Sequence, residues 1–296
     1  MTLQFLATKG TATANKKLIQ SSIGCSNYTE CFEGRLPAFA NLSDLTDSKT
    51  NDFNSFLLEY NSFNDINAVL INKDTGIEYP IIDNTYGKLF TPAQIGSLKF
   101  GFLLRWREVA NLIGFGNYDF KIEVSNSITT DIVFTELHKF RLMPFTCENA
   151  DNTVRITLEK LGYIENGNDY RGFSTGSWTD QIRFYGKLSN AGHNTETDNL
   201  LLSNRQLHQI QTQIIDKFSL RIDSVISSDA MRFLKDDLLS NVLTVDDYNR
   251  SNITNYKSLK VSLVDIEDPI QHEINGTYTY TINLVEFNQS TLKRNF

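Results

Sequence analysis

The chain has 296 residues, of which 40% are hydrophobic, 11% aromatic and 21% charged, and its formal net charge is −7. The 20 phenylalanines and 12 tyrosines supply apolar area that a disordered chain lacks, so we expect one large domain or two ordinary ones. The acidic balance argues against specific nucleic-acid binding through phosphate neutralisation. No apolar stretch approaches the roughly 20 residues of a membrane helix, so we expect no membrane insertion.

Cysteine and histidine usage gives no sign of a metal centre. Cys25, Cys31 and Cys147 cannot all pair within one chain, although Cys25 and Cys31 are close enough in sequence to close a small loop under oxidising conditions. The four histidines lack the spacing of a zinc site, so we expect no metal and no cofactor. The first ten residues carry no basic region followed by an apolar run, which predicts synthesis and folding in a cytoplasm.

Period-two alternation of apolar and polar residues is the strongest structural signal. It is typical of antiparallel strands with one buried and one wet face, and it differs from the continuous apolar strands of a parallel sheet. Residues 68–82 also read as a hairpin with turn residues at 73–76, where Pro80 favours an edge strand or a bulge. The clearest alternating stretches are 118–124, 154–158, 182–188, 259–263 and 278–284.

The longest alternating run is 210–226, in which Ile210, Ile214 and Phe218 share the even, mostly apolar positions. If extended throughout, this run spans on the order of 55 Å at about 3.3 Å per residue. Strands of this length occur in hairpins that project to pair with neighbouring subunits, or in closed barrels, because a long exposed edge invites aggregation. A bend near Asp216 would shorten the run, and two ordinary strands joined at a bulge are the alternative.

Helical periodicity is rare in this sequence. It predicts a helix over about 228–241 and a second one over 105–113. Thr91 and Pro92 read as a cap followed by proline at the first helical position, which predicts a single helical turn through Ser97.

The polar segment 189–198 predicts a domain boundary, because Ala191 is its one apolar residue. We therefore expect an N-terminal β-rich domain over 1–195 and a C-terminal β-sandwich over 196–296. The predicted fold class is mainly β, with antiparallel β-sandwich or barrel domains and one or two short helices.

No constellation of residues predicts catalysis. Gly114 and Gly116 precede a predicted strand, whereas a dinucleotide-binding loop needs a third glycine and a following helix. Asp246 and Asp247 lie at a predicted strand end, where Asp and Asn commonly form turns. The sequence also lacks a Gly-x-Ser-x-Gly elbow. We expect no catalytic residue and a protein that is not an enzyme.

Three parts of the chain are candidate interfaces. The loop over 162–178 presents aromatic residues that can stack on sugar rings, or can simply pack against another subunit. The basic chain end, which closes on an aromatic residue, can dock on a neighbour or form a solvated tail. The third part is the long strand. The candidate interface residues are Tyr170, Phe173, Trp178, Ile210, Ile214, Phe218, Arg294 and Phe296.

Several short segments of the chain are similar to those of one class of proteins. They are Tyr86-Gly87, Trp106-x-x-Val109 leading into Gly114-x-Gly116-x-Tyr118, Thr153–Leu161, Asp246-Asp247-Tyr248-Asn249 and the terminal Thr291-x-Lys293-Arg294. With the Asn-rich, strand-dominated composition, the chain resembles structural proteins of tailed bacteriophage particles, in particular distal-tail or baseplate proteins. The resemblance implies a tail-tube-like β-sandwich with a long hairpin, and it carries over no catalytic residue.

The resemblance implies a non-enzymatic structural protein located in the virion. Such a protein assembles as a homo-oligomeric ring, six subunits being one option, in the tail, baseplate or neck, with other virion proteins as partners. DNA can pass through an acidic lumen without binding to it. The alternative function is a carbohydrate- or receptor-binding module of a phage particle.

Overall fold

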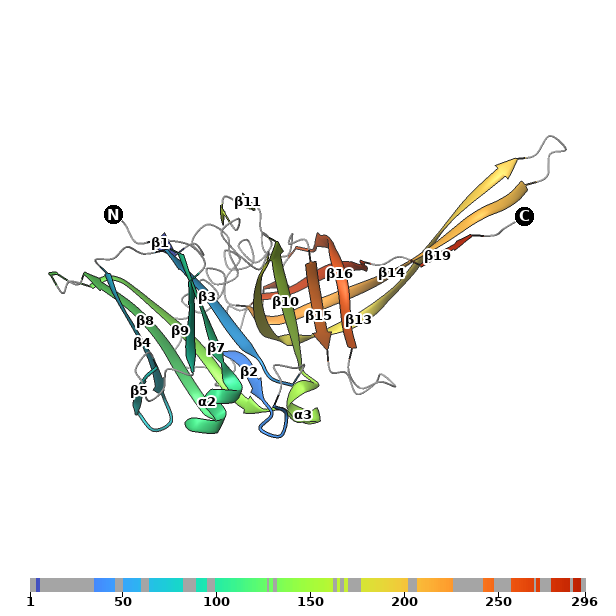
Figure 1. Ribbon diagram of the computed structural model, residues 1–296. Coiled ribbons are helices and arrows are strands. Elements are labelled where there is room, and N and C mark those ends of the chain that lie inside the picture. The colour runs from blue at the N-terminus through green and yellow to red at the C-terminus, as the bar shows by residue number, and fades with distance from the viewer. Residues whose placement is uncertain are drawn as a thin grey trace.

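The chain is mainly β, as the alternation predicts, and strands dominate the computed structural model in Figure 1. It forms a two-sheet unit, a closed barrel and a projecting hairpin. The structure describes residues 4–5, 35–45, 50–59, 64–81, 89–94, 99–126, 128–129, 132–161, 164–165, 168–169, 177–201, 207–225, 242–247, 257–268, 270–271, 278–287 and 290–293.

The N-terminal half folds into two sheets, which we call the sandwich. One sheet has the order β2-β9-β8-β4-β5, in which β2 and β9 are parallel and the other pairs antiparallel. The other has the order β1-β3-β7-β6. The bounds are β1 Gln4–Phe5, β2 Leu36–Ala40, β3 Phe53–Glu59, β4 Asn64–Asn72, β5 Glu78–Pro80, β6 Phe90–Gln94, β7 Lys99–Arg105, β8 Gly116–Asn126 and β9 Ile132–Pro144.

A large aromatic side chain marks the centre of the sandwich. The Trp106 ring is fully buried and lies 4.7 Å from the Phe140 ring and 6.3 Å from the Tyr118 ring, measured between centroids. Trp106 follows β7 of one sheet, whereas Tyr118 and Phe140 belong to β8 and β9 of the other. Aromatic contacts of this size contribute strongly to core packing, so this cluster holds the two sheets together.

The hairpin predicted over 68–82 is confirmed by β4 and β5. Its turn places Gly76 at a φ of +73°, a conformation that glycine adopts without strain. Pro80 lies in β5, an edge strand, where the missing N–H of proline costs no ladder hydrogen bond. The helical turn predicted from Thr91 and Pro92 is wrong, because both residues belong to β6, an edge strand that tolerates proline for the same reason.

The helix predicted over 105–113 is confirmed as α2, Trp106–Leu112. A second helix, α3 at Cys147–Ala150, was not predicted. Its N-cap is Thr146, whose hydroxyl accepts a hydrogen bond from the Asn149 N–H at 3.1 Å. The helix predicted over 228–241 falls on residues that the structure does not describe.

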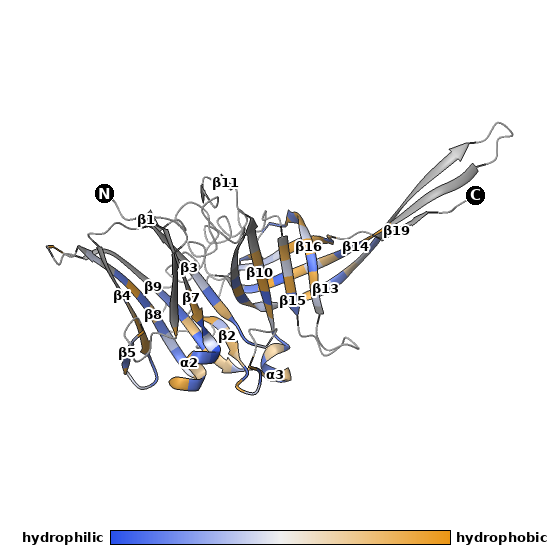
Figure 2. Ribbon diagram, in the orientation of Figure 1, coloured by the Kyte–Doolittle hydropathy of each residue, from blue (hydrophilic) through white to orange (hydrophobic). Residues whose placement is uncertain are grey.

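The C-terminal half forms a closed antiparallel barrel of six strands in the order β18-β16-β15-β10-β13-β14, and pairing of β18 with β14 closes it. Figure 2 shows hydrophobic and hydrophilic residues alternating along these strands. A short strand, β17, pairs with β18, and β19 pairs with β14. The bounds are β10 Thr153–Leu161, β11 Ile164–Glu165, β12 Asn168–Asp169, β13 Ser177–Leu201, β14 Leu207–Val225, β15 Val242–Asp247, β16 Lys257–Ile266, β17 Ile270–Gln271, β18 Tyr278–Glu286 and β19 Ser290–Lys293.

One glycine allows two barrel strands to approach each other closely. Gly186 of β13 pairs with Ile222 of β14, and a Cβ added to Gly186 would lie 2.1 Å from the backbone oxygen of Arg221. No side chain fits at that separation. The interior of the barrel is filled by buried apolar residues, among them Val154, Ile156, Ile182, Leu220, Ile222, Val245, Ile282 and Leu284.

The polar segment 189–198 lies inside the continuous strand β13 and is not a linker. The barrel takes β10 and the first half of β13 from residues before position 195, so the expected boundary at 195/196 cuts through one strand. The change from sandwich to barrel occurs instead around α3, between β9 and β10. Residues 189–193 are exposed, which explains their polar character: the strand leaves the barrel here.

Candidate functional site: the β13–β14 arm

Strands β13 and β14 continue past the barrel as a paired ribbon, seen projecting at the upper right of Figure 1. We define the arm as residues 192–201 and 207–216, where β14 has passed the end of its pairing with β18. At about 3.3 Å per residue, each strand of the arm is roughly 30 Å long. An arm of this length reaches well beyond the rest of the chain.

The long strand predicted over 210–226 is confirmed by β14, which runs without a break from Leu207 to Val225. The alternative of two shorter strands is wrong, and the register shift opposite Asp216 lies in β13, between Asn190 and Gly192. Gly192 has a φ of +107° there and donates its N–H to the Asn190 side chain at 2.7 Å. This β-bulge at the base of the arm bends one strand while β14 stays continuous.

The two outer edges of the arm differ. On the β14 side, β18 pairs with residues 217–225 up to the base of the arm, and β19 pairs with residues 211–214 within it. The outer edge of β13 from Gly186 to Leu201 pairs with no other strand in the part of the chain that the structure describes. An uncovered edge presents backbone N–H and C=O groups to a further strand.

The candidate interface residues on β14 lie at different depths. Phe218 is only 7% exposed and belongs to the barrel core of the single chain, whereas Ile214 is half-buried where the strand leaves the barrel. Ile210 lies in the arm, at the register shift between Asp198 and Asn199. The strand therefore joins the barrel core to the arm.

The other candidates are not brought together with the arm by any described contact. Trp178 lies in β13, where its backbone pairs with that of Lys160. Tyr170, Phe173, Arg294 and Phe296 fall on positions outside the described ranges.

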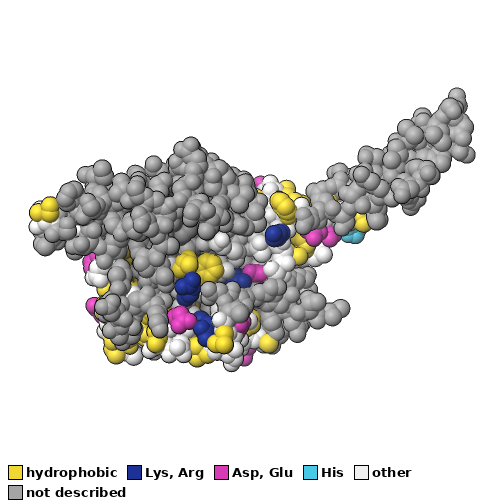
Figure 3. Space-filling view, in the orientation of Figure 1, with side chains coloured by type: hydrophobic (Ala, Val, Ile, Leu, Met, Phe, Trp, Pro, Cys, Tyr) yellow, Lys and Arg dark blue, Asp and Glu magenta, His cyan; other side chains and the backbone are white. Residues whose placement is uncertain are grey.

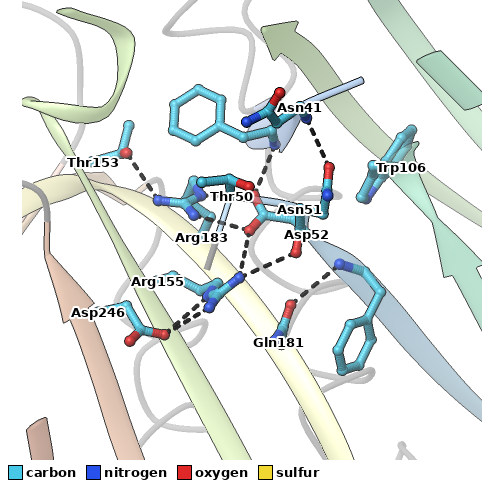
Figure 4. Close-up of polar contacts among 12 residues, drawn as sticks. Asn41, Thr50, Asn51, Asp52, Trp106, Thr153, Arg155, Gln181, Arg183 and Asp246 are labelled. Atoms are coloured by element: carbon cyan, nitrogen blue, oxygen red, sulfur yellow. Dashed lines mark hydrogen bonds and ion pairs between the residues drawn. The ribbon is translucent and has the colours of Figure 1, made fainter. Parts of the chain in front are cut away.

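A buried ionic cluster at the base of β13 was not predicted from the sequence. It consists of Asp52, Arg155, Arg183 and Asp246, each no more than 5% exposed (Figure 4). Arg183 binds the Asp52 carboxylate through Nε at 2.7 Å and Nη2 at 2.9 Å. Arg155 binds the same carboxylate at 3.2 Å and holds Asp246 through Nε at 3.0 Å and Nη2 at 2.9 Å. We call these four residues the ionic cluster.

The alternation over 154–158 and 182–188 predicts that Arg155 and Arg183 lie on the wet faces of their strands, and this is wrong for both, because they are buried. They lie directly opposite each other on β10 and β13, on the outer face of the barrel, and the sandwich covers that face. Two facing arginines repel unless carboxylates neutralise them, and Asp52 and Asp246 supply two negative charges for the two positive ones. Period-two alternation marks which face such a residue occupies but not what covers that face.

Burial alone would raise the pKa of Asp52. The charge and hydrogen bonds of Arg183, the charge of Arg155 and the Phe39 N–H outweigh this and hold the Asp52 pKa below its ordinary value of 3.8. Asp52 is therefore ionised at neutral pH. The Arg183 guanidinium also lies over the Phe39 ring, 4.4 Å from its centroid, a favourable cation–π contact.

A line of hydrogen bonds extends this contact along β13. The Asn54 amide donates to the Gln181 carbonyl at 2.6 Å, and the Ser55 hydroxyl donates to the Thr179 carbonyl at 2.8 Å. Asn54 in turn accepts a hydrogen bond from the Trp106 indole at 2.8 Å. The start of β3 thus attaches the sandwich to β13 at successive positions.

Among the described residues, no group of three or more His, Cys, Asp or Glu is arranged to hold a metal ion. Asp246 belongs to the ionic cluster, and Asp247 is buried at the end of β15. Among the helices described, none is long and apolar enough to cross a membrane. On the described part of the face in Figure 3, charged side chains of both signs lie interspersed.

No protein-family model matches the chain, and no curated protein matches it either. The candidate site therefore rests on the geometry of the arm and of the ionic cluster.

Proposed function

We propose that this protein is a non-enzymatic structural protein of a tailed-phage particle that assembles as a ring through the β13–β14 arm. The observation that carries the proposal is the arm itself: among the described residues, β19 pairs with residues 211–214 on the β14 side, whereas no strand pairs with the outer edge of β13 from Gly186 to Leu201. A monomeric protein rarely keeps a long open strand edge, because such an edge invites pairing with other chains. A neighbouring copy that adds a strand to β13 would cover it.

The rest of the chain supports a role in assembly. The barrel closes on itself and so has no other free edge within its ladder of six strands. The formal net charge of −7 fits a ring in the tail, baseplate or neck through which DNA passes without binding. The partners are further copies of this chain and other virion proteins, and the protein functions in the virion.

Removing the arm tests the proposal. In the truncated variant, residues 191–217 are replaced by Asn-Gly, a two-residue turn that can join β13 at Asn190 to β14 at Phe218. Native mass spectrometry and negative-stain electron microscopy should show rings for the full chain and monomers for the truncated variant. The near-identical circular dichroism of the two proteins would show that the barrel still folds.

A matched control separates edge pairing from a general effect of mutation. Thr195→Lys with Thr197→Lys puts charge on the uncovered strand, and edge lysines disfavour strand addition. Ile77→Lys places one lysine on an exposed residue beside β5, an edge strand of the sandwich. We expect the β13 pair to weaken assembly and the Ile77 variant to keep it. A full-length protein that stays monomeric at every concentration, with no ring in mixtures with other virion proteins, would refute the proposal.

A further inference from the structure

One strand carries both the arm and the attachment to the sandwich. Arg183 of the ionic cluster lies in β13, and the arm begins further along the same strand at Gly192. Between them, β14 is bonded on both sides, by β13 and by β18, along residues 217–222. A ladder paired on both sides bends little, so the direction in which β13 leaves the cluster sets the direction of the arm.

Asp52 connects this strand to the frame of the sandwich. Its backbone N–H donates to the Phe39 carbonyl at 2.9 Å, and its backbone carbonyl accepts from the Trp106 N–H at 3.1 Å. Its side chain accepts the Phe39 N–H at 2.8 Å in addition to the bonds from Arg155 and Arg183. Because β2 and α2 both hold Asp52, the carboxylate has a fixed position in the sandwich.

The attachments form a row along β13 and not a single point. Thr179, Gln181 and Arg183 each bond to the segment 52–55. These residues alternate along one strand, so they span about 13 Å at about 3.3 Å per residue. A single contact permits rotation about it, whereas a row of directional hydrogen bonds fixes an axis.

The chemistry of the cluster favours orientation over stability. Replacing a buried ion pair by apolar residues of similar volume is often neutral for stability, because desolvation of the charges offsets their attraction. A bidentate guanidinium–carboxylate pair, however, tolerates little change in angle. The cluster therefore adds little net stability, but its directional bonds are well suited to fix the angle between the sandwich and β13.

We propose that the ionic cluster orients the arm: it locks β13 to the sandwich so that the arm leaves the molecule in one direction. The importance of that direction for assembly rests on the proposed function, since copies that pair through their arms close a ring only at a defined angle. The orienting role itself is a property of the single chain and can be measured without assembly.

The test compares distances between spin labels in the monomeric fraction. The native cysteines are replaced by serine, and labels are placed at His193→Cys at the base of the arm and Thr75→Cys in the β4–β5 turn, both exposed positions. A variant with Asp52→Asn, Arg155→Met, Arg183→Met and Asp246→Asn removes two charges of each sign, so the formal net charge stays at −7. We expect the distance distribution between the labels to widen about twofold in this variant, because the bonds of Arg155 and Arg183 to Asp52 are gone and, among the described contacts, only those at Gln181 and Thr179 still join the segment 52–55 to β13.

Two controls make the result specific. A second label pair, His193→Cys with Asp268→Cys, reports on arm and barrel, and its distribution should not change. Arg35→Met with Asp119→Asn removes a buried ion pair of 2.8 Å that lies within the sandwich, and the distance between positions 75 and 193 should keep its width.

An unchanged distribution between positions 75 and 193 in the folded quadruple variant would overturn the inference. If that variant does not fold, the single variant Asp52→Asn is measured instead. An unchanged width of its distance distribution would also overturn the inference. Rings that survive arm truncation would refute the proposed function and leave the orienting role intact, so the two failures are distinguishable.

Discussion

At the scale of single residues, Asp52 is a buried carboxylate whose hydrogen bonds all come from the protein. Its carboxylate accepts four hydrogen bonds, from the Phe39 N–H, from two nitrogens of Arg183 and from one of Arg155. Those bonds use about all the acceptor sites of an ionised carboxylate. Loss of this one charge would leave Arg183 buried without its carboxylate partner.

Asp52→Asn should therefore lower the free energy of unfolding by about 3–5 kcal/mol, the usual cost of breaking a buried ion pair on one side. Urea denaturation followed by circular dichroism measures this. The matched control is Asp223→Asn, which breaks an ion pair with Arg221, a side chain that is 62% exposed. That change should cost about 0–1 kcal/mol. Equal losses in the two variants would contradict the structural account of Asp52.

The lowered pKa of Asp52 also predicts a pH dependence. A carboxyl with a lower pKa in the folded than in the unfolded protein contributes stability that is fully present above the unfolded value, near 3.8, and is lost as the pH falls through the folded value. The unfolding free energy should thus fall more steeply below about pH 4 in the natural protein than in Asp52→Asn. Parallel curves for the two proteins would show that Asp52 does not titrate as described.

The raised pKa of Tyr118 predicts that the protein loses stability at high pH. Burial raises its pKa to about 12, and its hydroxyl donates to the Gly114 carbonyl at 2.8 Å. Since the folded pKa lies above the ordinary value of 10.0, the stabilisation is full below pH 10 and is lost as the pH rises toward 12. Ultraviolet absorbance is titrated for the natural protein and for Tyr118→Phe. The difference between the two curves should show one phenol ionising near pH 12. A difference midpoint near 10 would contradict the buried position.

At the scale of elements, β14 changes its surroundings along its length. Among the described residues, 217–222 are bonded to β13 and β18, 211–214 to β13 and the short strand β19, and 207–209 to β13 with no second strand beside them. Hydrogen-exchange protection follows the number and permanence of such pairings. One end of β14 is therefore part of the barrel, whereas its other end is part of the arm.

Hydrogen exchange measured by mass spectrometry should give a gradient along β14 in the monomer. Amides of 217–222 should exchange slowest, those of 211–214 faster, and those of 207–209 fastest. In the assembled state, peptides covering 186–201 of β13 should gain protection if a neighbour adds a strand there. Uniform exchange along β14 would contradict the described pairing.

The sequence predicts most of the strands because their signal is local. Residues 118–124, 182–188 and 278–284 alternate clearly and form parts of β8, β13 and β18. It does not predict α3, whose one turn is too short for helical periodicity. It misplaces Thr91 and Pro92, because a cap followed by proline is also compatible with an edge strand.

At the scale of the whole molecule, the sandwich and the barrel share one buried core. The cluster of buried apolar residues runs continuously from Leu36 of the sandwich to Leu284 of the barrel. Scanning calorimetry should accordingly show a single unfolding transition for the natural protein, since shared burial couples the two units. Two resolved transitions in the natural protein would contradict this continuity.

The sequence by itself determined the mainly β class, the long strand and the hairpin at 68–82, because period-two alternation and turn residues act over a few neighbouring positions. Only the tertiary structure decided which faces of those strands are buried, where one unit ends, and that Asp52 meets Arg183, 131 positions further along the chain. Polar residues at 189–198 suggest a linker in sequence but belong to strand β13 in space. The physical reason is that pairing, closure and docking depend on contacts between distant segments, which alternation within one segment does not encode.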